Sequence, residues 1–215
     1  MQSNGYLTYF KIPYKEYEMD KQAVDCMDNR EFLHKEIQKM FGTSRVDSSV
    51  LYRIDKSNRN QEIIIAVKSA VVPDIEKSKL FYRYKTDLKT VDLSKYYAGL
   101  GEGVCANFKL EAFPYYYYCK EGKKNPVRRV IKHPEKRAEW LRKKLEDAGL
   151  ELVSLTENRD CFQKKISKAP SGTGFFKTFQ FSGKVVVKDE NKAAKALEDG
   201  IGPEKAYGAG FLILY

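Results

Sequence analysis

The sequence of 215 residues has little of what metal sites and disulfide frameworks are built from, since it contains two histidines and four cysteines. The cysteines are Cys26, Cys105, Cys119 and Cys161, and they form no C-x-x-C pair. None of them has a neighbouring histidine, so the spacing indicates neither a zinc site nor a thioredoxin-like motif. No cluster of metal ligands or paired carboxylates stands out elsewhere. We therefore expect a protein without a metal or another cofactor, in a reducing cytosol.

Long apolar runs are missing as well. No stretch approaches the roughly 20 consecutive apolar residues that a helix needs to cross a bilayer. The first residues are polar and lack the apolar centre of a signal peptide. The sequence thus predicts a cytoplasmic protein with no membrane partner.

Positive charge, in contrast, is abundant. The chain has 39 Lys and Arg against 29 Asp and Glu, a formal net charge of +10 and a pI near 9.2. Between residues 120 and 144, eleven basic residues stand against three acidic ones. A polyanion such as a nucleic acid is the first partner to consider for such a chain.

Apolar periodicity in the first half predicts a ferredoxin-like order of elements. Alternation predicts strands over residues 6–12, 50–55, 62–69 and 81–85. The spacing of Leu33, Ile37 and Phe41 predicts a helix over residues 29–41, and a helical turn is expected after Pro73. Strand, helix, two strands, short helix and strand is the ferredoxin-like plan.

The second half repeats this plan. Strands are predicted over residues 104–113, 150–155 and 179–187, and helices over residues 134–148 and 191–199. The apolar residues that end the chain supply a last strand. The predicted fold class is therefore α+β, with two tandem ferredoxin-like (RRM-like) domains at residues 1–90 and 104–215 and a linker at residues 91–103.

Two segments of the second half have the composition of nucleic-acid-binding elements. Residues 157–174 are basic and rich in turn residues, which predicts a protruding hairpin with a cationic stem that includes Lys164, Lys165 and Lys168. The run Tyr115–Tyr118 has residues able to stack on bases. An edge strand or hairpin of mixed exposure is the interpretation we favour, because single-strand binders usually space their aromatic residues along a sheet.

A glycine-rich stretch lies between the last predicted helix and the last strand. It contains Gly200, Gly202, Gly208, Gly210 and Lys205. One interpretation is a loop that cradles phosphates with its N–H groups and Lys205. The other is a helix C-cap followed by a loop whose glycines allow close packing, and the glycines alone favour this second interpretation.

The two histidines are the only candidates for acid–base catalysis by imidazole. His133 precedes Pro134 at the start of a predicted helix, where a capping or solvated role is the simpler interpretation. His34 lies beside the apolar stripe of its helix, with a ring able to reach solvent. By position alone, each is more readily a surface residue than a catalyst.

Three stretches of the second half together resemble the CasE family, the repeat-cleaving endoribonucleases of type I-E CRISPR systems. They are I-K-H-P-E-K-R-A-E-W-L-R-K-K-L-E-D-A-G at residues 131–149, F-Q-F-S-G-K-V-V-V at residues 179–187, and G-I-G-P-E-K-A-Y-G-A-G-F-L at residues 200–212. In the first half, L-H-K-E-I-Q-K-M-F at residues 33–41 is similar to the family's first helix. The match is close in the second half and looser in the first.

The resemblance implies that His34 is the catalytic histidine of a metal-independent endoribonuclease. In this family the ribose 2′-OH attacks the adjacent phosphate and leaves a 2′,3′-cyclic phosphate and a 5′-OH. His34 would act as base or acid, and the sequence leaves the choice open. The chain departs from the family by carrying Glu31 three residues before the histidine, where some members have tyrosine, and Glu111 where a cation is expected.

The resemblance also implies an RNA-binding set and partners. Its members are Arg128, Arg129, Lys164, Lys165, Lys168, Gly202, Lys205, Gly208 and Gly210. They would bind a CRISPR repeat hairpin, and the protein would stay with the mature crRNA beside the other subunits of the type I-E effector complex. Two alternatives remain: a guide-RNA-binding subunit of the same fold that does not cut, and an RRM-like protein for unstructured single strands.

Overall fold

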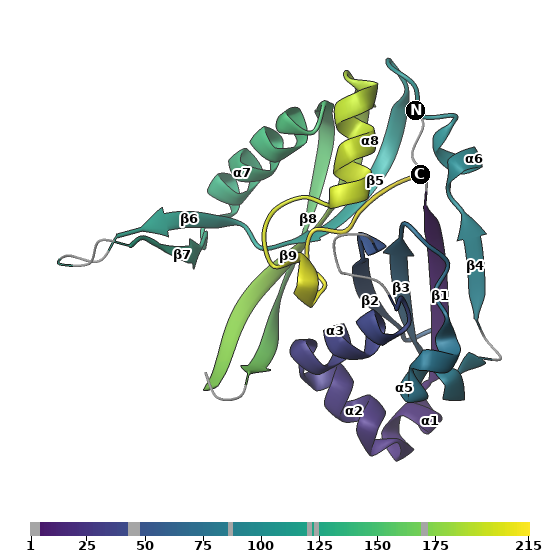
Figure 1. Ribbon diagram of the computed structural model, residues 1–215. Helices are drawn as coiled ribbons and strands as arrows, with labels where there is room; N and C mark the ends of the chain where they lie inside the picture. Colours follow the sequence, from purple (N-terminus) through teal and green to yellow (C-terminus); the bar gives the residue numbers. More distant parts are fainter. Residues whose placement is uncertain (1–4, 43–47, 86–87, 120–121, 123–124, 169–171) are drawn as a thin grey trace.

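Two four-stranded antiparallel sheets with the same strand order form the frame of the molecule (Figure 1). The structure is a computed structural model that describes residues 5–42, 48–85, 88–119, 122, 125–168 and 172–215, with only the backbone described at residues 157–162, 167 and 168. The first sheet contains β1 (Tyr6–Pro13), β2 (Leu51–Ser57), β3 (Glu62–Ser69) and β4 (Lys89–Asp92) in the order β2-β3-β1-β4. The second contains β5 (Cys105–Ala112), β8 (Leu150–Lys168), β9 (Gly172–Val187) and β10 (Leu212–Leu214) in the order β10-β5-β9-β8. In each sheet the first strand lies between the third and the fourth, which confirms two tandem ferredoxin-like units.

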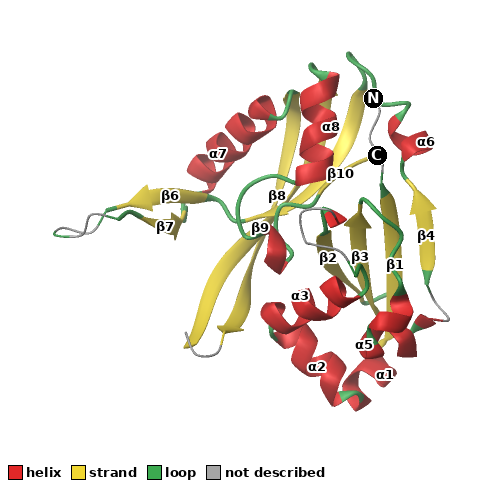
Figure 2. Ribbon diagram, viewed as in Figure 1, coloured by secondary structure: helices red, strands yellow, loops and turns green. Residues whose placement is uncertain are grey.

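Helices cover one face of each sheet (Figure 2). The first unit carries α1 (Tyr14–Met19), α2 (Lys21–Asp28), α3 (Arg30–Lys39), the 3-10 turn η1 (Ile75–Lys77) and α5 (Lys79–Arg83). The second carries α7 (Pro134–Asp147), α8 (Glu190–Asp199) and the 3-10 turn η3 (Lys205–Tyr207), while α6 (Ser94–Tyr97) lies between the units. Residues 14–28, which show no clear periodicity, thus form two short helices.

The opposite face of the first sheet packs against the second unit. Leu7, Leu51 and Ala66 of the first sheet belong to the same buried cluster as Phe108 and Leu212 of the second. A separate cluster beneath α2, α3 and α5 forms the core of the first unit. The two halves therefore share a core, and residues at their junction are held in fixed positions.

The helix α3 forms where its apolar spacing predicts it. Leu33 and Ile37 lie on its buried face. At its N-terminus the side-chain oxygen of Asn29 accepts a hydrogen bond from the Glu31 N–H at 3.1 Å, which is a typical N-cap. The side chain at position 34 is therefore presented from a well-defined helix.

The predicted strand at residues 81–85 is wrong. Ser78 caps a helix there, with the Phe81 N–H donating to its Oγ at 3.4 Å, and Leu80, Phe81 and Tyr84 are buried at helical spacing. The fourth strand is instead β4, which pairs with the start of β1. It is short, exposed and poor in apolar residues, so its sequence has no alternation to detect. β4 extends past residue 90, which is the predicted end of the first domain. The predicted boundaries of the two domains and of the linker at residues 91–103 stay a prediction.

Two hairpins extend from the second unit (Figure 1). β6 (Tyr115–Tyr118) pairs with β7 (Val127–Val130), which confirms the favoured interpretation of the tyrosine run. The outer halves of β8 and β9 form the other hairpin, which passes beside α3 and joins it through a bridge between Asn29 and Lys165.

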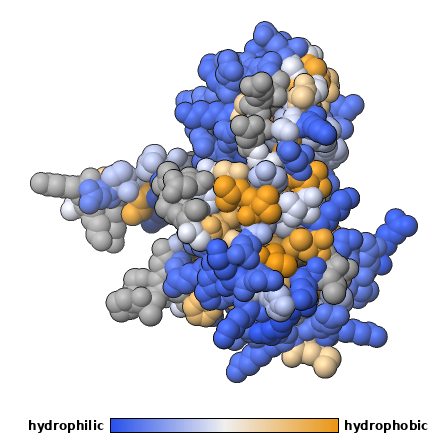
Figure 3. Space-filling view, turned by 45° about the vertical axis from the view of Figure 1, so that its right-hand side comes forward, coloured by the Kyte–Doolittle hydropathy of each residue, from blue (hydrophilic) through white to orange (hydrophobic). Residues whose placement is uncertain are grey.

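The surface is divided by polarity. In Figure 3 hydrophobic residues gather near the middle of the face shown, and hydrophilic residues cover both ends. Among the described residues, no helix has the length and apolar character required to cross a membrane.

Candidate functional site

His34 lies where α3 of the first unit meets the glycine-rich loop of the second. Its side chain is half-buried, and its Nδ1 atom is buried. The ring makes an edge-to-face contact with Tyr207 of η3, with 6.3 Å between ring centroids and 75° between planes. Phe176 of β9 packs on the other side of Tyr207, with ring centroids 6.2 Å apart. The fold therefore brings the candidate histidine and the candidate loop together.

The glycines of this loop are needed for its backbone path. Gly200, Gly202, Gly208 and Gly210 all have positive φ angles, between 73° and 86°. A Cβ at Gly208 would lie 2.9 Å from the Tyr52 ring, and one at Gly210 would lie 2.6 Å from the carbonyl oxygen of Ile201. Several of the loop's N–H groups donate within the protein, including that of Ile201 to the Gly210 carbonyl at 2.8 Å and that of Gly210 to the Glu111 carbonyl at 2.7 Å. The loop is thus built for close packing.

Replacing Gly208 with alanine is expected to lower the free energy of unfolding by about 1–3 kcal/mol, because a side chain at positive φ is strained and its Cβ overlaps Tyr52. Urea denaturation measures this change. Gly174→Ala is the control, since Gly174 lies outside the positive-φ region and no atom lies within 4 Å of its Cβ position. The control should change the free energy by no more than about 0.5 kcal/mol. Equal effects of the two substitutions would contradict the assigned packing.

A buried ion pair lies beneath the loop. Lys164 Nζ is 2.5 Å from Glu111 Oε1, and both side chains are only 5% exposed. Thr178 Oγ1 donates to the same carboxylate oxygen at 2.5 Å, and Lys164 Nζ donates to the Gly208 carbonyl at 3.2 Å. Burial lowers the pKa of the Lys164 ammonium to about 8, with Glu111 acting in the opposite direction. The pair therefore ties β8 and β5 to the loop that carries Tyr207.

The predicted cationic stem is split by the alternation of the strand. Lys164 points inward, whereas Lys165 is exposed, because successive side chains of a strand point to opposite faces. Lys168 ends β8 opposite Gly172, and its side chain lies outside the described residues. Of the three lysines, Lys165 is the one whose described side chain faces solvent.

Arg128 and Arg129 lie on the other hairpin, on β7. The Arg128 guanidinium lies over the Tyr115 ring at 5.3 Å and that of Arg129 over the Tyr118 ring at 4.0 Å. Both arginines are exposed. Arg128 also makes an ion pair with Glu204 of the glycine-rich loop at 3.6 Å. The β6–β7 hairpin therefore presents stacked tyrosines and arginines and is linked to the loop.

Gly202 and Lys205 lie against the helices of the second unit. The Cβ position of Gly202 lies 3.4 Å from the Trp140 ring. Lys205 lines a shallow groove of about 260 Å³ between α7 and α8, together with Lys144, Lys192 and Lys195. The predicted RNA-binding set is thus divided among the two hairpins and the loop, and Tyr207 of the loop contacts His34.

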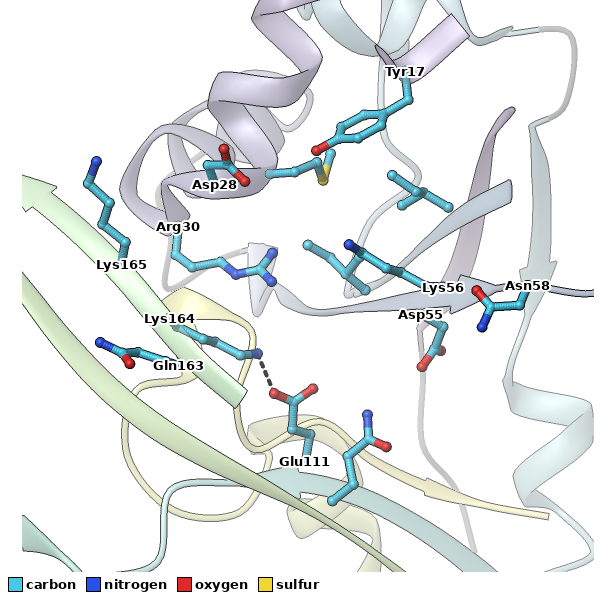
Figure 4. A pocket seen from close by; sticks show the side chains of 14 residues that line it. Tyr17, Asp28, Arg30, Asp55, Lys56, Asn58, Glu111, Gln163, Lys164 and Lys165 are labelled. Atoms are coloured by element: carbon cyan, nitrogen blue, oxygen red, sulfur yellow. Dashed lines mark ion pairs between the residues drawn. The ribbon is translucent and has the colours of Figure 1, made fainter. Parts of the chain in front are cut away.

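A cavity of about 640 Å³ opens between α2, α3, β2 and β8 (Figure 4). Lys56 and Lys165 line it, as do the carboxylates of Asp28, Asp55 and Glu111. Figure 4 shows Arg30 extending into it from α3. Sequence reasoning missed Arg30, although its position four residues before His34 places both on one face of the helix. It also missed Tyr207 and Thr178, which only the fold brings to the site.

Among the residues that the structure describes, no three His, Cys, Asp or Glu side chains are grouped so that they could hold a metal ion. His133, the second histidine, is exposed at the N-cap of α7 and makes no capping hydrogen bond with its side chain.

Comparison with known proteins relates the whole chain to one family. The model of the family described as CRISPR associated protein matches residues 6–215. No curated protein sequence matches significantly. Among solved structures, Thermus thermophilus Cse3 bound to an RNA representing a pre-cleavage complex is 20% identical, with a TM-score of 0.79 over 99% of each chain. The CRISPR endoribonuclease Cse3 bound to a 19-nucleotide RNA is 20% identical, with a TM-score of 0.78 over all of both chains. A chain of a CRISPR RNA-guided surveillance complex, pre-nicking, is 19% identical, with a TM-score of 0.66 over 97% of this chain and 98% of that one. These structures share the fold described above.

Proposed function

Since the chain belongs to the CRISPR-associated protein family, we propose that it is a metal-independent endoribonuclease of the CasE type. It binds CRISPR repeat hairpins in precursor crRNA, cuts them, and stays with the mature crRNA as a subunit of the type I-E effector complex in the cytoplasm. The observation that carries this proposal is the position of His34, half-buried against Tyr207 where the two units meet. Similar folds include RNA-bound Cse3 and a subunit of an RNA-guided surveillance complex, which supports the RNA and the partners.

The chemistry follows from what an imidazole can do beside a ribose. The 2′-OH attacks the adjacent phosphorus, the bond to the 5′-oxygen of the next nucleotide breaks, and the products are a 2′,3′-cyclic phosphate and a 5′-OH. His34 takes the proton of the 2′-OH or supplies one to the leaving oxygen. Because Nδ1 is buried, we assign the transfer to Nε2. Tyr207 holds the ring in orientation from its edge.

The two hairpins and the loop supply the RNA-binding surface. A-form RNA is read mainly through its shape and phosphates, because its major groove is deep and narrow. Arg128 and Arg129 on β7 and Lys165 and Lys168 on β8 supply cations on two projecting arms, and Lys205 adds one on the loop. Lys164 acts indirectly, by holding the Gly208 carbonyl through its buried ammonium.

The test is cleavage of a CRISPR repeat hairpin RNA in buffer containing EDTA. We expect one cut at the base of the hairpin. The upstream product should resist alkaline phosphatase until acid opens its cyclic phosphate, and the downstream product should accept phosphate from polynucleotide kinase without prior dephosphorylation. The control is the same RNA with a 2′-deoxy nucleotide before the cut, which lacks the nucleophile. Tight binding without cutting would instead identify a non-catalytic guide-RNA-binding subunit, and preference for unstructured RNA would identify a single-strand binder.

A further inference from the structure

Arg30 lies on the same face of α3 as His34. The two residues are four positions apart, which places them about one turn, or about 6 Å, from each other along the helix. Arg30 is the first residue of α3, directly after the Asn29 cap. A strand of RNA that reaches His34 therefore passes within one nucleotide of Arg30.

The guanidinium of Arg30 has an unsatisfied hydrogen-bond donor. Within the described residues its Nη1 atom is buried and has no hydrogen-bond partner. Of the three carboxylates that line the cavity, Glu111 pairs with Lys164 at 2.5 Å and Asp55 with Arg53 at 2.7 Å. The third, Asp28, makes no ion pair with Arg30 among the described residues. A buried donor without a hydrogen-bond partner is costly, so an anion that accepts from Nη1 would remove an existing penalty.

The cavity has the size and chemistry of a site for one nucleotide. Its volume of about 640 Å³ lies within the range of about 300–1,000 Å³ typical of small-molecule sites. Besides Arg30 it is lined by the Tyr17 ring and the side-chain amides of Asn58, Gln163 and Gln180. Unstacked RNA bases are recognised by stacking on aromatic rings and by hydrogen bonds to their edges, and a guanidinium matches a phosphate with two parallel hydrogen bonds.

We propose that this cavity holds one unpaired nucleotide next to the scissile bond, and that Arg30 binds its phosphate. The inference rests on the proposed function, because it takes the RNA strand to run past His34. The bound phosphate would fix the neighbouring phosphodiester relative to the imidazole, which makes Arg30 a substrate-positioning residue.

The experiment compares Arg30→Met with Lys35→Met in single-turnover cleavage of the repeat RNA. Both substitutions remove one positive charge from α3, but Lys35 is exposed and pairs with Glu31 on the outer surface at 3.6 Å. We expect Arg30→Met to slow cleavage by about 100-fold and Lys35→Met to change it less than about twofold. Arg30→Lys, which keeps a charge but loses the planar fork, should slow cleavage by about tenfold.

A second arm identifies the phosphate. Substrates with an uncharged methylphosphonate at one position at a time, on either side of the cut, are tested with wild type and Arg30→Met. At the position that Arg30 binds, the neutral linkage should slow wild type strongly and the variant little, because the interaction is already lost. A structural role for Arg30 would not produce this dependence. The melting temperature of Arg30→Met should not fall, since the substitution removes a buried donor that has no hydrogen-bond partner among the described residues.

The inference is overturned if Arg30→Met cuts as fast as Lys35→Met. It is also overturned if, at every position, the neutral linkage slows Arg30→Met by the same factor as it slows wild type. Failure of the proposed function is distinguishable, because wild type itself would then not cut. In that case the binding affinities of wild type and Arg30→Met are measured for the same set of RNAs. The inference is overturned if the two proteins have equal affinities for every RNA of the set. If Arg30→Met does not fold, the comparison is made with Arg30→Lys.

Discussion

Replacing His34 with alanine is expected to lower the single-turnover rate of repeat cleavage by about 10³-fold, while RNA affinity changes no more than a few-fold. General acid–base catalysis by a positioned side chain contributes about 10²–10⁴-fold, and His34 is the imidazole held at the junction of the two units. Affinity is preserved because the exposed cations assigned to RNA binding, Arg128, Arg129 and Lys165, lie on the β6–β7 and β8–β9 hairpins. The rate is measured with labelled repeat RNA in EDTA, and the affinity with the 2′-deoxy substrate.

His133→Ala is the matched control, because His133 is exposed at the start of α7 and its side chain makes no capping bond. It should cut at the wild-type rate. If His34→Ala cuts as fast as His133→Ala, the catalytic assignment fails and the guide-RNA-binding alternative gains support.

The same variant separates the roles of base and acid. A substrate in which sulfur replaces the leaving 5′-oxygen needs no proton on the leaving group. If His34 is the acid, this substrate restores most of the lost rate to His34→Ala. If His34 is the base, the loss stays nearly the same with sulfur as with oxygen.

Replacing Lys164 with methionine is expected to lower the free energy of unfolding by about 3–5 kcal/mol, because it leaves Glu111 buried without its cation. Thr178 alone would then stabilise the carboxylate. The substitution also removes the bond to the Gly208 carbonyl, so cleavage should slow even under conditions where the variant is folded. Urea denaturation measures the first effect and single-turnover cleavage the second.

Lys188→Met is the control for stability. Lys188 and Glu151 form an ion pair of 2.8 Å, but their side chains are 59% and 58% exposed, and such pairs contribute about 0–1 kcal/mol. Replacing both members of the buried pair, as in Lys164→Met with Glu111→Leu, should recover part of the lost stability. A cost for Lys164→Met no larger than that of Lys188→Met would show that the buried pair contributes nothing.

The elements with strong apolar periodicity were predictable. The helix around Leu33 and Ile37 and the strand around Phe181 and Val185 are found where the sequence places them, because each buries a face with its own regular period. The predicted strand at residues 81–85 is wrong because a short apolar run fits the period of a strand as well as that of a helix. The Ser78 cap and the packing of this segment against the core favour a helix. β4 has no periodicity to detect, because its place is set by pairing with β1.

The candidate site, too, was predictable only in part. By itself the sequence determined the family, the positions of His34 and the glycine-rich loop, the tandem fold and the excess of positive charge, because these depend on local patterns of residue type. Only the tertiary structure decided that Tyr207 contacts His34 and that Lys164 is buried against Glu111 while Lys165 is exposed. It also decided that, within the described residues, the Nη1 atom of Arg30 is buried without a hydrogen-bond partner. The physical reason is that burial and charge compensation depend on which distant strands and helices pack together, and no local spacing of residues records those contacts.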